Sequence, residues 1–360
     1  MFRALQLAER ARGHTYPNPM VGCVVVCANG AIFEGWHSRV GAAHAEVEAL
    51  DAARRAGAKL QGASLYVTLE PCSHYGRTPP CADRIIEEGI AKVYIACLDP
   101  NPQVAGQGVA KLEAAKVEVV VGVLEREAQA LNEVFFYHIQ AQRPFVLYKY
   151  AMTLDGKTAS KTGDARWVSS ARAREDVHHL RHEYQAIAVG IGTVLADNPK
   201  LDCRLDGGRS PIKVIYDRRL RCPIDARIFE ADDRGEAARV IIFHSVDADS
   251  TELRHRAQLC AIDAADDADF IGQSLGYLYE QGICSVLLEG GAQLAWAFLE
   301  AHGITKVRCY LAAKLLGGAA PTALAGAGFE RMAQALPLHD IQVEAVGDDN
   351  LVVEGRLQYP

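Results

Sequence analysis

Residues 70–81 have the sequence Glu70-Pro71-Cys72-Ser73-His74-Tyr75-Gly76-Arg77-Thr78-Pro79-Pro80-Cys81, and the tripeptide His44-Ala45-Glu46 precedes them. One imidazole and two thiols suit a zinc ion, and three protein ligands leave a fourth tetrahedral position open for water. Zinc lowers the pKa of such a water toward neutrality, and a nearby carboxylate can move its proton. The pattern predicts a zinc-dependent hydrolytic deaminase in which His44, Cys72 and Cys81 bind the metal and Glu46 is catalytic.

The spacing of the two cysteines is unusual, because zinc deaminases commonly carry Pro-Cys-x-x-Cys. The neighbouring pattern supports the site all the same: it predicts a strand over 62–69, a helix over 44–55, and a helix over 81–89 that follows two prolines and ends at a glycine. Cys81 at a helix start would lie in a field that favours the thiolate. Two alternatives stay open, namely a structural zinc site with His74 as fourth ligand and unconnected buried cysteines.

The composition limits the class of protein. With 360 residues, 49% of them hydrophobic and 23% charged, the chain is long enough for two globular domains. The net charge of −7 argues against a nucleic-acid partner, and no apolar run is long enough to predict a membrane span. An amphipathic helix over 1–10 and ten cysteines without a compact framework indicate reduced thiols and a cytoplasmic location.

The first half alternates strands and helices. Strands over 21–28 and 31–36 form a predicted hairpin at Asn29-Gly30. Further strands are expected over 92–98 and 117–121, and a helix over 108–115, which gives a sheet with helices on its faces. A single helix over 124–142 ends before Arg143-Pro144, so the predicted domains are 1–143 and 144–360.

The second half predicts a mostly parallel α/β domain, because short apolar runs alternate with helical stretches. These runs lie at 145–152, 186–190, 212–216, 240–243 and 285–288, and the polar stretch 225–236 is a predicted loop. Residues 286–294 combine a strand, the turn Gly290-Gly291 and a helix start, whose N–H groups can hold phosphate. A Gly-Gly pair is more often only a turn.

On these residues the chain resembles the RibD family, the bifunctional deaminase-reductases of riboflavin biosynthesis. The resemblance rests on TYPNPMVG (15–22), HAE (44–46) and EPCSHYGRTPPC (70–81), then on TLDGK (153–157), GTVLADNP (192–199) and LEGG (288–291). The long insert between the cysteines is typical of this family. It implies an α/β protein with an N-terminal three-layer cytidine-deaminase-like domain and a C-terminal dihydrofolate-reductase-like domain.

The resemblance also implies two successive reactions on a small pyrimidine ribosyl phosphate. Domain 1–143 would remove the 2-amino group of 2,5-diamino-6-ribosylamino-4(3H)-pyrimidinone 5′-phosphate as ammonia, using one zinc ion. Domain 144–360 would use NADPH to reduce the ribosyl group to ribityl, giving 5-amino-6-ribitylamino-uracil 5′-phosphate. A homo-oligomer held through the reductase half is further implied.

Residue roles follow from the same resemblance. In the deaminase it places Asn18 beside the substrate, with His74 and Arg77 near the ribose phosphate; alone, these would be ordinary turn and loop residues. It implies that NADPH is contacted by Ala151, Trp167, Thr193, Asp197, Gly291, Ala292, Gln293, Leu294, Ala295, Trp296 and Ala297. The resemblance also implies that the substrate is contacted by Arg181, Leu201, Arg204 and Glu289. Arginine suits a ribosyl phosphate because it binds phosphate through paired donors. Core packing of Trp167 and a solvated face for Arg181 are the alternatives.

Some points remain open. The cluster Asp217-Arg218-Arg219-Leu220-Arg221 either receives the 2′-phosphate of NADPH or forms a charged turn. Ala165 replaces a small hydroxyl residue that is common in the family, so either a substrate hydrogen bond is missing or Ser169 or Ser170 compensates. Loss of the reductase activity alone is a further alternative. A nucleic-acid-editing deaminase is a further alternative, but it needs a basic channel and the net charge of this chain is −7. A non-catalytic binding protein is another, but it would not need Glu46 together with three metal ligands.

Overall fold

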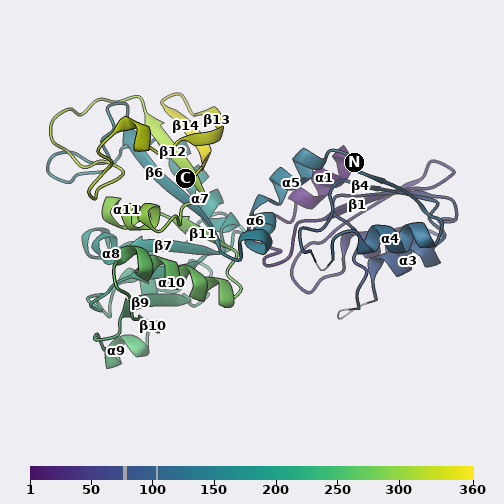
Figure 1. The fold of residues 1–360 in the computed structure, drawn as a ribbon, viewed down its shortest axis with the longest axis horizontal. Coiled ribbons are helices and arrows are strands. Elements are labelled where there is room, and N and C mark those ends of the chain that lie inside the picture. Colours follow the sequence, from purple (N-terminus) through teal and green to yellow (C-terminus); the bar gives the residue numbers. More distant parts are fainter. Residues whose placement is uncertain (76–78, 103) are drawn as a thin grey trace. The chain divides into compact units, whose positions relative to one another are not determined.

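The chain divides into two compact units, Met1–Gln142 and Arg143–Pro360 (Figure 1). The structure is a computed structural model that describes residues 1–75, 79–102 and 104–360. The boundary predicted from the sequence lies at Arg143-Pro144. Each unit has a sheet and an apolar core of its own, and each is described by itself. No helix in the described part of the chain is long and apolar enough to cross a membrane.

The first unit is built on a five-stranded sheet with the order β2-β1-β3-β4-β5. Its elements are α1 (Phe2–Glu9), β1 (Gly22–Val26), β2 (Ile32–Trp36), α2 (Ala45–Arg55), β3 (Ser64–Val67), α3 (Cys81–Glu87), β4 (Lys92–Ile95), α4 (Gln107–Ala114), β5 (Glu118–Val121), α5 (Glu125–Leu131) and α6 (Glu133–Ala141). Strand β1 is antiparallel to β2 and β3, whereas β3, β4 and β5 are parallel. The predicted hairpin is confirmed, with Val26 opposite Ile32 and Gly30 at φ 83°.

Helices cover both faces of this sheet, which confirms the predicted three layers. Successive side chains of a strand point to opposite faces: Val25 packs in the core with α2 and α3, whereas Val24 packs against α1. A Cβ added at Gly35 would lie 2.4 Å from the carbonyl oxygen of Ala45, so the start of α2 lies directly on β2. This close approach fixes the position of the helix that carries Glu46.

The predicted single helix over 124–142 is wrong, because the chain forms two helices that meet at Asn132. Asn132 leaves helical geometry with φ −107° and ψ 26°. Its buried side chain accepts from the N–H of Met20 (2.8 Å) and donates to the carbonyl of Met20 (2.9 Å). These two long-range hydrogen bonds compensate for the interrupted helix, and a helical sequence pattern does not reveal them.

The second unit is a nine-stranded sheet with the order β10-β9-β8-β7-β11-β6-β12-β14-β13. Its elements are β6 (Phe145–Thr153), α7 (Ala171–Glu183), β7 (Ala186–Gly190), α8 (Ile191–Asp197), β8 (Ile212–Tyr216), η1 (Arg227–Phe229), β9 (Val240–Ser245), α9 (Thr251–Arg254), β10 (Gln258–Ile262), α10 (Asp267–Glu280), β11 (Ser285–Leu288), α11 (Ala292–Glu300), β12 (Lys306–Ala312), η2 (Met332–Gln334), β13 (Leu338–Val346) and β14 (Asn350–Leu357). The predicted mostly parallel order is confirmed; the antiparallel pairs are β12–β14 and β14–β13.

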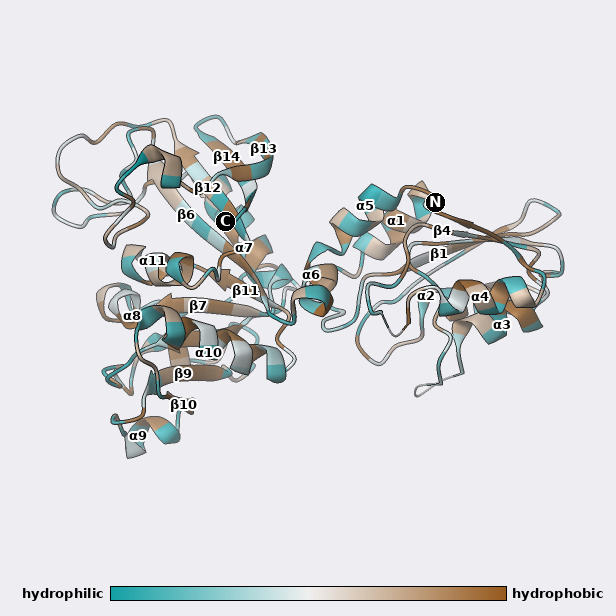
Figure 2. Ribbon diagram, viewed as in Figure 1, coloured by the Kyte–Doolittle hydropathy of each residue, from teal (hydrophilic) through white to brown (hydrophobic). Residues whose placement is uncertain are grey.

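The central strands of this sheet are buried on both faces. All four residues of β11 are buried, and Figure 2 shows the hydrophobic colouring of the neighbouring strand β7 and of β9 in the same sheet. Helices α10 and α11 contribute Phe270, Leu275 and Phe298 to this core. Full burial explains why these strands are continuous apolar runs in the sequence. Strands β10, β12, β13 and β14 were not predicted from the sequence. Of these, β13 is largely exposed and mixes polar with apolar residues.

Candidate functional site

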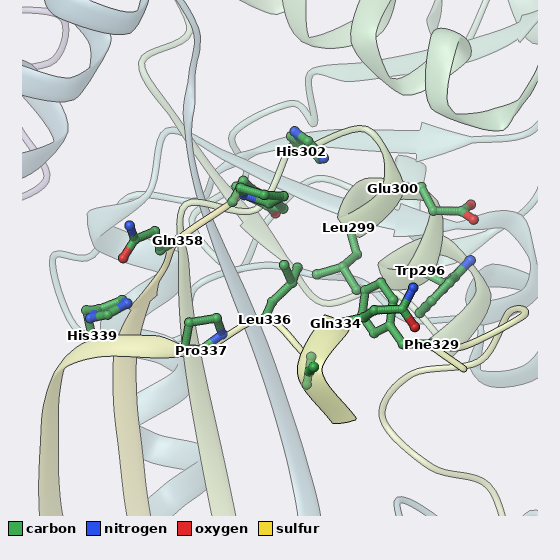
Figure 3. Close-up of a pocket in the computed structure, with 14 residues that line it drawn as sticks. Trp296, Leu299, Glu300, His302, Phe329, Gln334, Leu336, Pro337, His339 and Gln358 are labelled. Carbon is green, nitrogen blue, oxygen red and sulfur yellow. The ribbon is translucent and has the colours of Figure 1, made fainter. Parts of the chain in front are cut away.

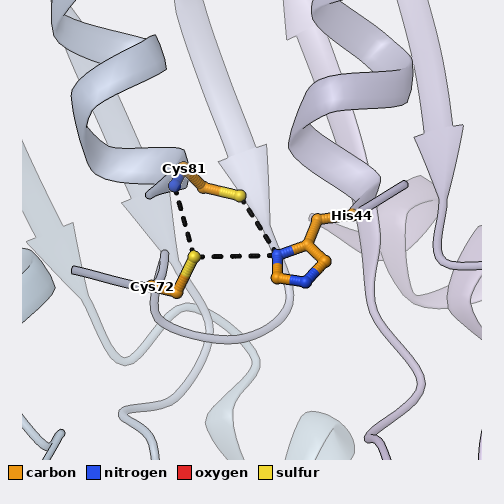
Figure 4. A group of neighbouring side chains, drawn as sticks. All are labelled: His44, Cys72 and Cys81. Carbon is orange, nitrogen blue, oxygen red and sulfur yellow. Dashed lines mark hydrogen bonds between the residues drawn. The ribbon is translucent and has the colours of Figure 1, made fainter. Parts of the chain in front are cut away.

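The three predicted zinc ligands come together at one end of the first sheet (Figure 4). His44 precedes α2, Cys72 follows β3 in a loop, and Cys81 begins α3. The Nδ1 of His44 lies 3.3 Å from the Sγ of Cys81 and 3.7 Å from the Sγ of Cys72. Ligand atoms on a tetrahedral zinc ion are about 3.5 Å apart, given metal–ligand bonds of about 2.0–2.3 Å. The donor set and its geometry therefore fit zinc.

His74 does not join this group. Among the described residues, the cluster able to hold a metal consists of His44, Cys72 and Cys81, whose ligand atoms lie within 4.8 Å of one another. His74 lines the neighbouring cavity instead. A site with three protein ligands favours catalysis over a purely structural role.

The thiol that the structure makes acidic is Cys72. The pKa of Cys72 is lowered to about 4 by hydrogen bonds. The largest effect comes from the side chain of Cys81, followed by the side chain of His44 and the N–H of Cys81. The pKa of Cys81 is raised by the adjoining Cys72 and by burial. The thiolate on Cys81 stays a prediction, and the N–H of Cys81 at the start of α3 donates to the Sγ of Cys72 at 3.2 Å. The start of α3 thus stabilises the charge of its neighbour.

Glu46 lies in the first turn of α2 and is only 4% exposed. Burial, with a further contribution from the charge of Cys72, raises its pKa to about 7. A carboxyl group with a pKa near neutrality can both accept and return a proton, which general acid–base catalysis requires. Its position beside His44 places this group next to the metal-binding atoms.

A cavity of about 260 Å³ adjoins the triad. It is lined by Asn18, Pro19, Val21, His37, His44, Ala45, Glu46, Leu69, Glu70, Cys72, His74, Asp99 and Phe135. The predicted substrate residues Asn18 and His74 both line it, whereas Arg77 lies outside the described residues. Sequence reasoning missed His37, Asp99 and Phe135, which carry no recognisable spacing, and gave no role to Glu70, although Glu70 begins the motif 70–81.

The side-chain amide of Asn18 is oriented by His37. The Nδ2 of Asn18 lies 3.1 Å from the Nε2 of His37, and the Nδ1 of His37 lies 3.1 Å from the carbonyl oxygen of Ala43. An amide nitrogen only donates, so Nε2 accepts and the proton of His37 is on Nδ1. The Oδ1 of Asn18 is therefore the atom left to accept a hydrogen bond from a ligand.

Glu70 anchors the loop that carries Cys72. Its buried carboxylate accepts from the N–H groups of Gly106 (2.9 Å), Gly108 (2.8 Å), Val109 (3.2 Å) and Asp99 (3.3 Å). A Cβ at Gly108 would lie 2.1 Å from the carbonyl of Pro71, so this contact requires glycine. Four backbone donors on one carboxylate hold the zinc loop against the start of α4.

In the second unit, the structure brings together predicted substrate residues around a buried ion cluster. Arg181 donates to Glu289 through Nε (3.0 Å) and Nη2 (3.2 Å), and to the carbonyl of Asp202 (3.2 Å). Lys149, which sequence reasoning missed, lies 3.5 Å from Glu289. Burial alone would raise the pKa of Glu289, but Arg181 and Lys149 lower it to about 2. Arg181 is thus not a solvated helix residue.

Leu201 and Arg204 flank Asp202 in the chain. Leu201 is buried, whereas the side chain of Arg204 is 55% exposed and lies 3.4 Å from Asp202. Since Arg181 is occupied by Glu289 and Asp202, Arg204 is the more available of the two predicted cations.

The predicted cofactor segment forms the start of α11. Gly291 precedes the helix, and a Cβ added there would lie 4.0 Å from the Oγ1 of Thr193 on α8, so these two predicted residues are neighbours. Ala295 and Ala297 are buried in the core. The groups that remain accessible to a ligand are therefore those of the first turn, from Gly291 to Gln293.

The other predicted cofactor residues lie on separate elements. Ala151 is on β6 opposite Tyr310, and Asp197 is exposed at the end of α8. Trp167 is 61% exposed, which excludes the alternative of core packing; the guanidinium of Arg174 lies 4.2 Å from its ring centre. The Nζ of Lys314 donates to the carbonyl oxygen of Trp167 (2.9 Å).

The basic cluster after β8 is partly engaged. Arg218 pairs with Asp267 (2.7 Å) and stacks over Phe270, and Arg221 pairs with Asp217 (3.6 Å). Arg219 is exposed. Two of the three arginines thus form the charged turn of the alternative, and Arg219 alone stays a candidate for the 2′-phosphate.

A larger cavity of about 690 Å³ lies between α11 and the C-terminal segment (Figure 3). Of the predicted cofactor residues it includes Trp296, whose ring packs at 5.6 Å from that of Phe329. A Cβ at Gly326 would lie 2.1 Å from the Trp296 ring, so this packing also requires glycine. The cavity is mainly apolar, and the predicted substrate residues do not line it.

Comparisons with known proteins cover both units. A family model described as the RibD C-terminal domain matches residues 144–352, and one described as the cytidine and deoxycytidylate deaminase zinc-binding region matches residues 1–97. The riboflavin biosynthesis protein RibD of Actinobacillus pleuropneumoniae is 43% identical over 98% of this chain and 93% of that protein. That of Escherichia coli (strain K12) is 38% identical, over 97% of this chain and 96% of that protein.

Solved structures give the same result. A diaminohydroxyphosphoribosylaminopyrimidine deaminase/5-amino-6-(5-phosphoribosylamino)uracil reductase from Thermotoga maritima has a TM-score of 0.86 and 40% identity, covering 99% of this chain and 97% of that chain. Acinetobacter baumannii RibD has a TM-score of 0.87 and 38% identity, covering 99% and 98%. Both similarities extend through the two units.

Proposed function

Because this chain belongs to the RibD family of riboflavin biosynthesis proteins, we propose that its two units act in succession on one pyrimidine ribosyl phosphate. The chain is a bifunctional enzyme with a zinc-dependent deaminase and an NADPH-dependent reductase. The proposed substrate is 2,5-diamino-6-ribosylamino-4(3H)-pyrimidinone 5′-phosphate, and the proposed product is 5-amino-6-ribitylamino-uracil 5′-phosphate. The observation that carries the proposal is the cavity in which Glu46 lies beside His44, Cys72 and Cys81.

In the deaminase, each described residue has a separate task. When bound by His44, Cys72 and Cys81, a zinc ion supplies a Lewis acid that lowers the pKa of water. Glu46 accepts the proton of the attacking water and delivers it to the amino group, which leaves as ammonia. The Oδ1 of Asn18 accepts a hydrogen bond from the edge of the pyrimidine, and His37 keeps that oxygen directed to the ligand.

In the reductase, the residues mainly bind and position. NADPH supplies the hydride that reduces the ribosyl carbon. The N–H groups from Gly291 to Gln293 are suited to the cofactor phosphate, with Thr193 beside them. Arg204 is suited to the substrate phosphate, and the Arg181–Glu289 pair keeps the segment around Asp202 in place. Positioning of this kind accounts for most of the effect of a hydride-transfer site.

The test follows ammonia release and NADPH oxidation separately in zinc-loaded protein. We expect ammonia from the free pyrimidine ribosyl phosphate and none from RNA, which separates this function from that of a nucleic-acid-editing enzyme. The Glu46→Gln variant should keep its zinc and its NADPH oxidation with the deaminated substrate, but lose at least about a hundredfold in deamination, as general acid–base catalysis contributes that much. Deamination by the variant at the wild-type rate would refute the role of Glu46.

The NADPH-oxidation assay tests whether the reductase is active although Ala165 stands in place of a hydroxyl residue. NADPH oxidation with the deaminated substrate is expected despite the missing hydroxyl. Ser170 is the proposed substitute; it is the N-cap of α7, and its side chain accepts from the N–H of Ala173. Preference for NADPH over NADH is expected to depend on Arg219. Equal use of both nicotinamides would contradict a 2′-phosphate contact there.

We further propose a cytoplasmic homo-oligomer. All ten cysteines are free thiols, which suits a reducing compartment. Exposed apolar side chains on β13 and β14, including Ile341 (58%), Val343 (61%) and Leu351 (46%), support an interface formed by the reductase unit.

A further inference from the structure

Helix α6, the last element of the first unit, supplies part of the cavity that contains Glu46. Its Phe135 lines that cavity together with Asn18 and His44. The deaminase family model ends at residue 97 and the reductase family model begins at residue 144, so neither match includes α6. A residue outside both matched regions therefore belongs to the wall of the reacting site.

The residues around this cavity fall into a polar and an apolar group. The polar group includes Asn18, Glu46 and Asp99. The apolar group includes Val21, Leu69 and Phe135, which also pack in one hydrophobic cluster. Among the described lining residues, Phe135 supplies the one benzene ring. A flat heteroaromatic ligand needs both groups, because its edge forms hydrogen bonds and its face needs apolar contact.

Asn132 fixes Phe135 relative to the loop that carries Asn18. Asn132 precedes Phe135 by one helical turn and is 3% exposed. It forms two hydrogen bonds with Met20, which follows Asn18 by two residues. The apolar wall and the hydrogen-bonding loop of the cavity are therefore joined by a rigid contact.

We infer that Phe135 is a substrate-binding residue of the deaminase, whose ring packs against the face of the substrate's pyrimidine ring while Asn18 binds its edge. This inference rests on the proposed function. Contact with the face of the ring is the same before and after the amino group is replaced by oxygen. Its loss should therefore weaken the binding of substrate and product alike and leave the chemical step unchanged.

The experiment uses the full, zinc-loaded chain. We expect Phe135→Leu to raise the deaminase KM roughly tenfold with kcat retained, as stacking of one base on an aromatic side chain contributes that order of binding. The inhibition constant of the deaminated product, measured against ammonia release, should rise by the same factor. The matched control is Phe136→Leu, because Phe136 packs in the same cluster but does not line the cavity; its KM should equal that of the wild type.

Two further variants of Phe135 distinguish the effect of an aromatic ring from the effect of side-chain volume. Phe135→Tyr keeps an aromatic ring and should restore the KM, whereas Phe135→Met keeps the bulk without the ring and should behave like Phe135→Leu. Zinc content reports whether each variant retains the folded site. Equal KM values for Phe135→Leu and Phe136→Leu, or full restoration by methionine, would overturn the inference. If the wild type released no ammonia at all, the proposed function itself would fall, and this inference with it.

Discussion

The pKa values of two buried carboxyl groups, one in each unit, are shifted in opposite directions. Burial raises the pKa of Glu46 to about 7, because its surroundings offer little compensation for a negative charge. Glu289 is also buried, but Arg181 and Lys149 lower its pKa to about 2. The first carboxyl group can exchange protons near neutral pH, and the second remains an anion. This difference matches a proton carrier in the deaminase and a fixed charge in the reductase.

Glu289→Gln tests the fixed charge. Removing one partner of a buried ion cluster leaves Arg181 and Lys149 without compensation, so the reductase unit should lose about 3 kcal/mol of stability. The folded-state pKa of about 2 lies below the ordinary 4.5, so the stabilisation is complete above pH 4.5 and is lost as the pH falls toward 2. Thermal unfolding from pH 5 to 8 should thus show a constant difference from the wild type.

A matched control for this measurement is Glu300→Gln, at an exposed position on α11. It should leave the unfolding transition unchanged. A difference between wild type and Glu289→Gln that disappeared at pH 7 would contradict the assigned charge state.

The residues of the zinc site were predictable because zinc chemistry demands particular donors at recognisable positions. His44, Cys72, Cys81 and Glu46 form a motif, and the structure places them together. His37, Lys149 and Phe135 could not be predicted in the same way. Lys149 contacts Glu289, 140 residues away in the chain, and a single histidine, lysine or phenylalanine has no spacing that marks it.

At the scale of elements, the strands that were predicted are the ones whose burial determines their sequence. Strands β7, β8 and β11 have the bounds expected from continuous apolar runs, because helices cover both faces of the sheet. Strands β13 and β14 were missed, because β13 is exposed along most of its length and β14 mixes buried, half-buried and exposed residues, so neither is a continuous apolar run. The break between α5 and α6 was missed because the hydrogen bonds of Asn132 come from a loop more than a hundred residues away.

The break itself can be tested with Asn132→Ala. The substitution removes two buried hydrogen bonds and leaves the N–H of Met20 unsatisfied, so we expect a loss of about 2 kcal/mol in the stability of the deaminase unit. Because the loop with Asn18 loses its anchor, the deaminase KM should also rise. Denaturant unfolding and ammonia-release kinetics measure the two effects.

Gln129→Ala is the appropriate control, since Gln129 is exposed on α5 and its side chain donates to Glu125 of the same helix. It should change the free energy of unfolding by no more than a few tenths of a kcal/mol, the usual range for surface substitutions, and it should leave the deaminase KM unchanged. If Asn132→Ala behaved like this control, the loop would not depend on the break.

At the scale of the whole molecule, the chain combines two folds with separate cores. The resemblance seen in the sequence correctly predicted both, because its motifs lie at the strand ends and helix starts that define each fold. What it did not predict is the extent of the second sheet, which continues through β12, β14 and β13. On β13, Ile341 and Val343 lie on one face, and Leu351 on β14 is paired with Ala345 of the same face.

Substitutions on this face of β13 and β14 test the proposed homo-oligomer. Val343→Glu places a charge in the proposed interface and should lower the molar mass measured by light scattering to that of one chain. Gln342→Glu adds the same charge on the opposite face of β13 and should leave the mass unchanged. An unaltered mass for both variants, with an oligomeric wild type, would place the interface elsewhere.

The position of Phe135 has a consequence for modular evolution and for protein engineering. The deaminase is complete only at α6, whose last residue is Ala141, and the first strand of the reductase begins at Phe145. Any exchange of reductases between such proteins, by recombination or in the laboratory, must therefore join the parts within residues 142–144. A fragment cut where the zinc-binding similarity stops would keep all its metal ligands but lose the aromatic wall against which the pyrimidine ring is proposed to pack.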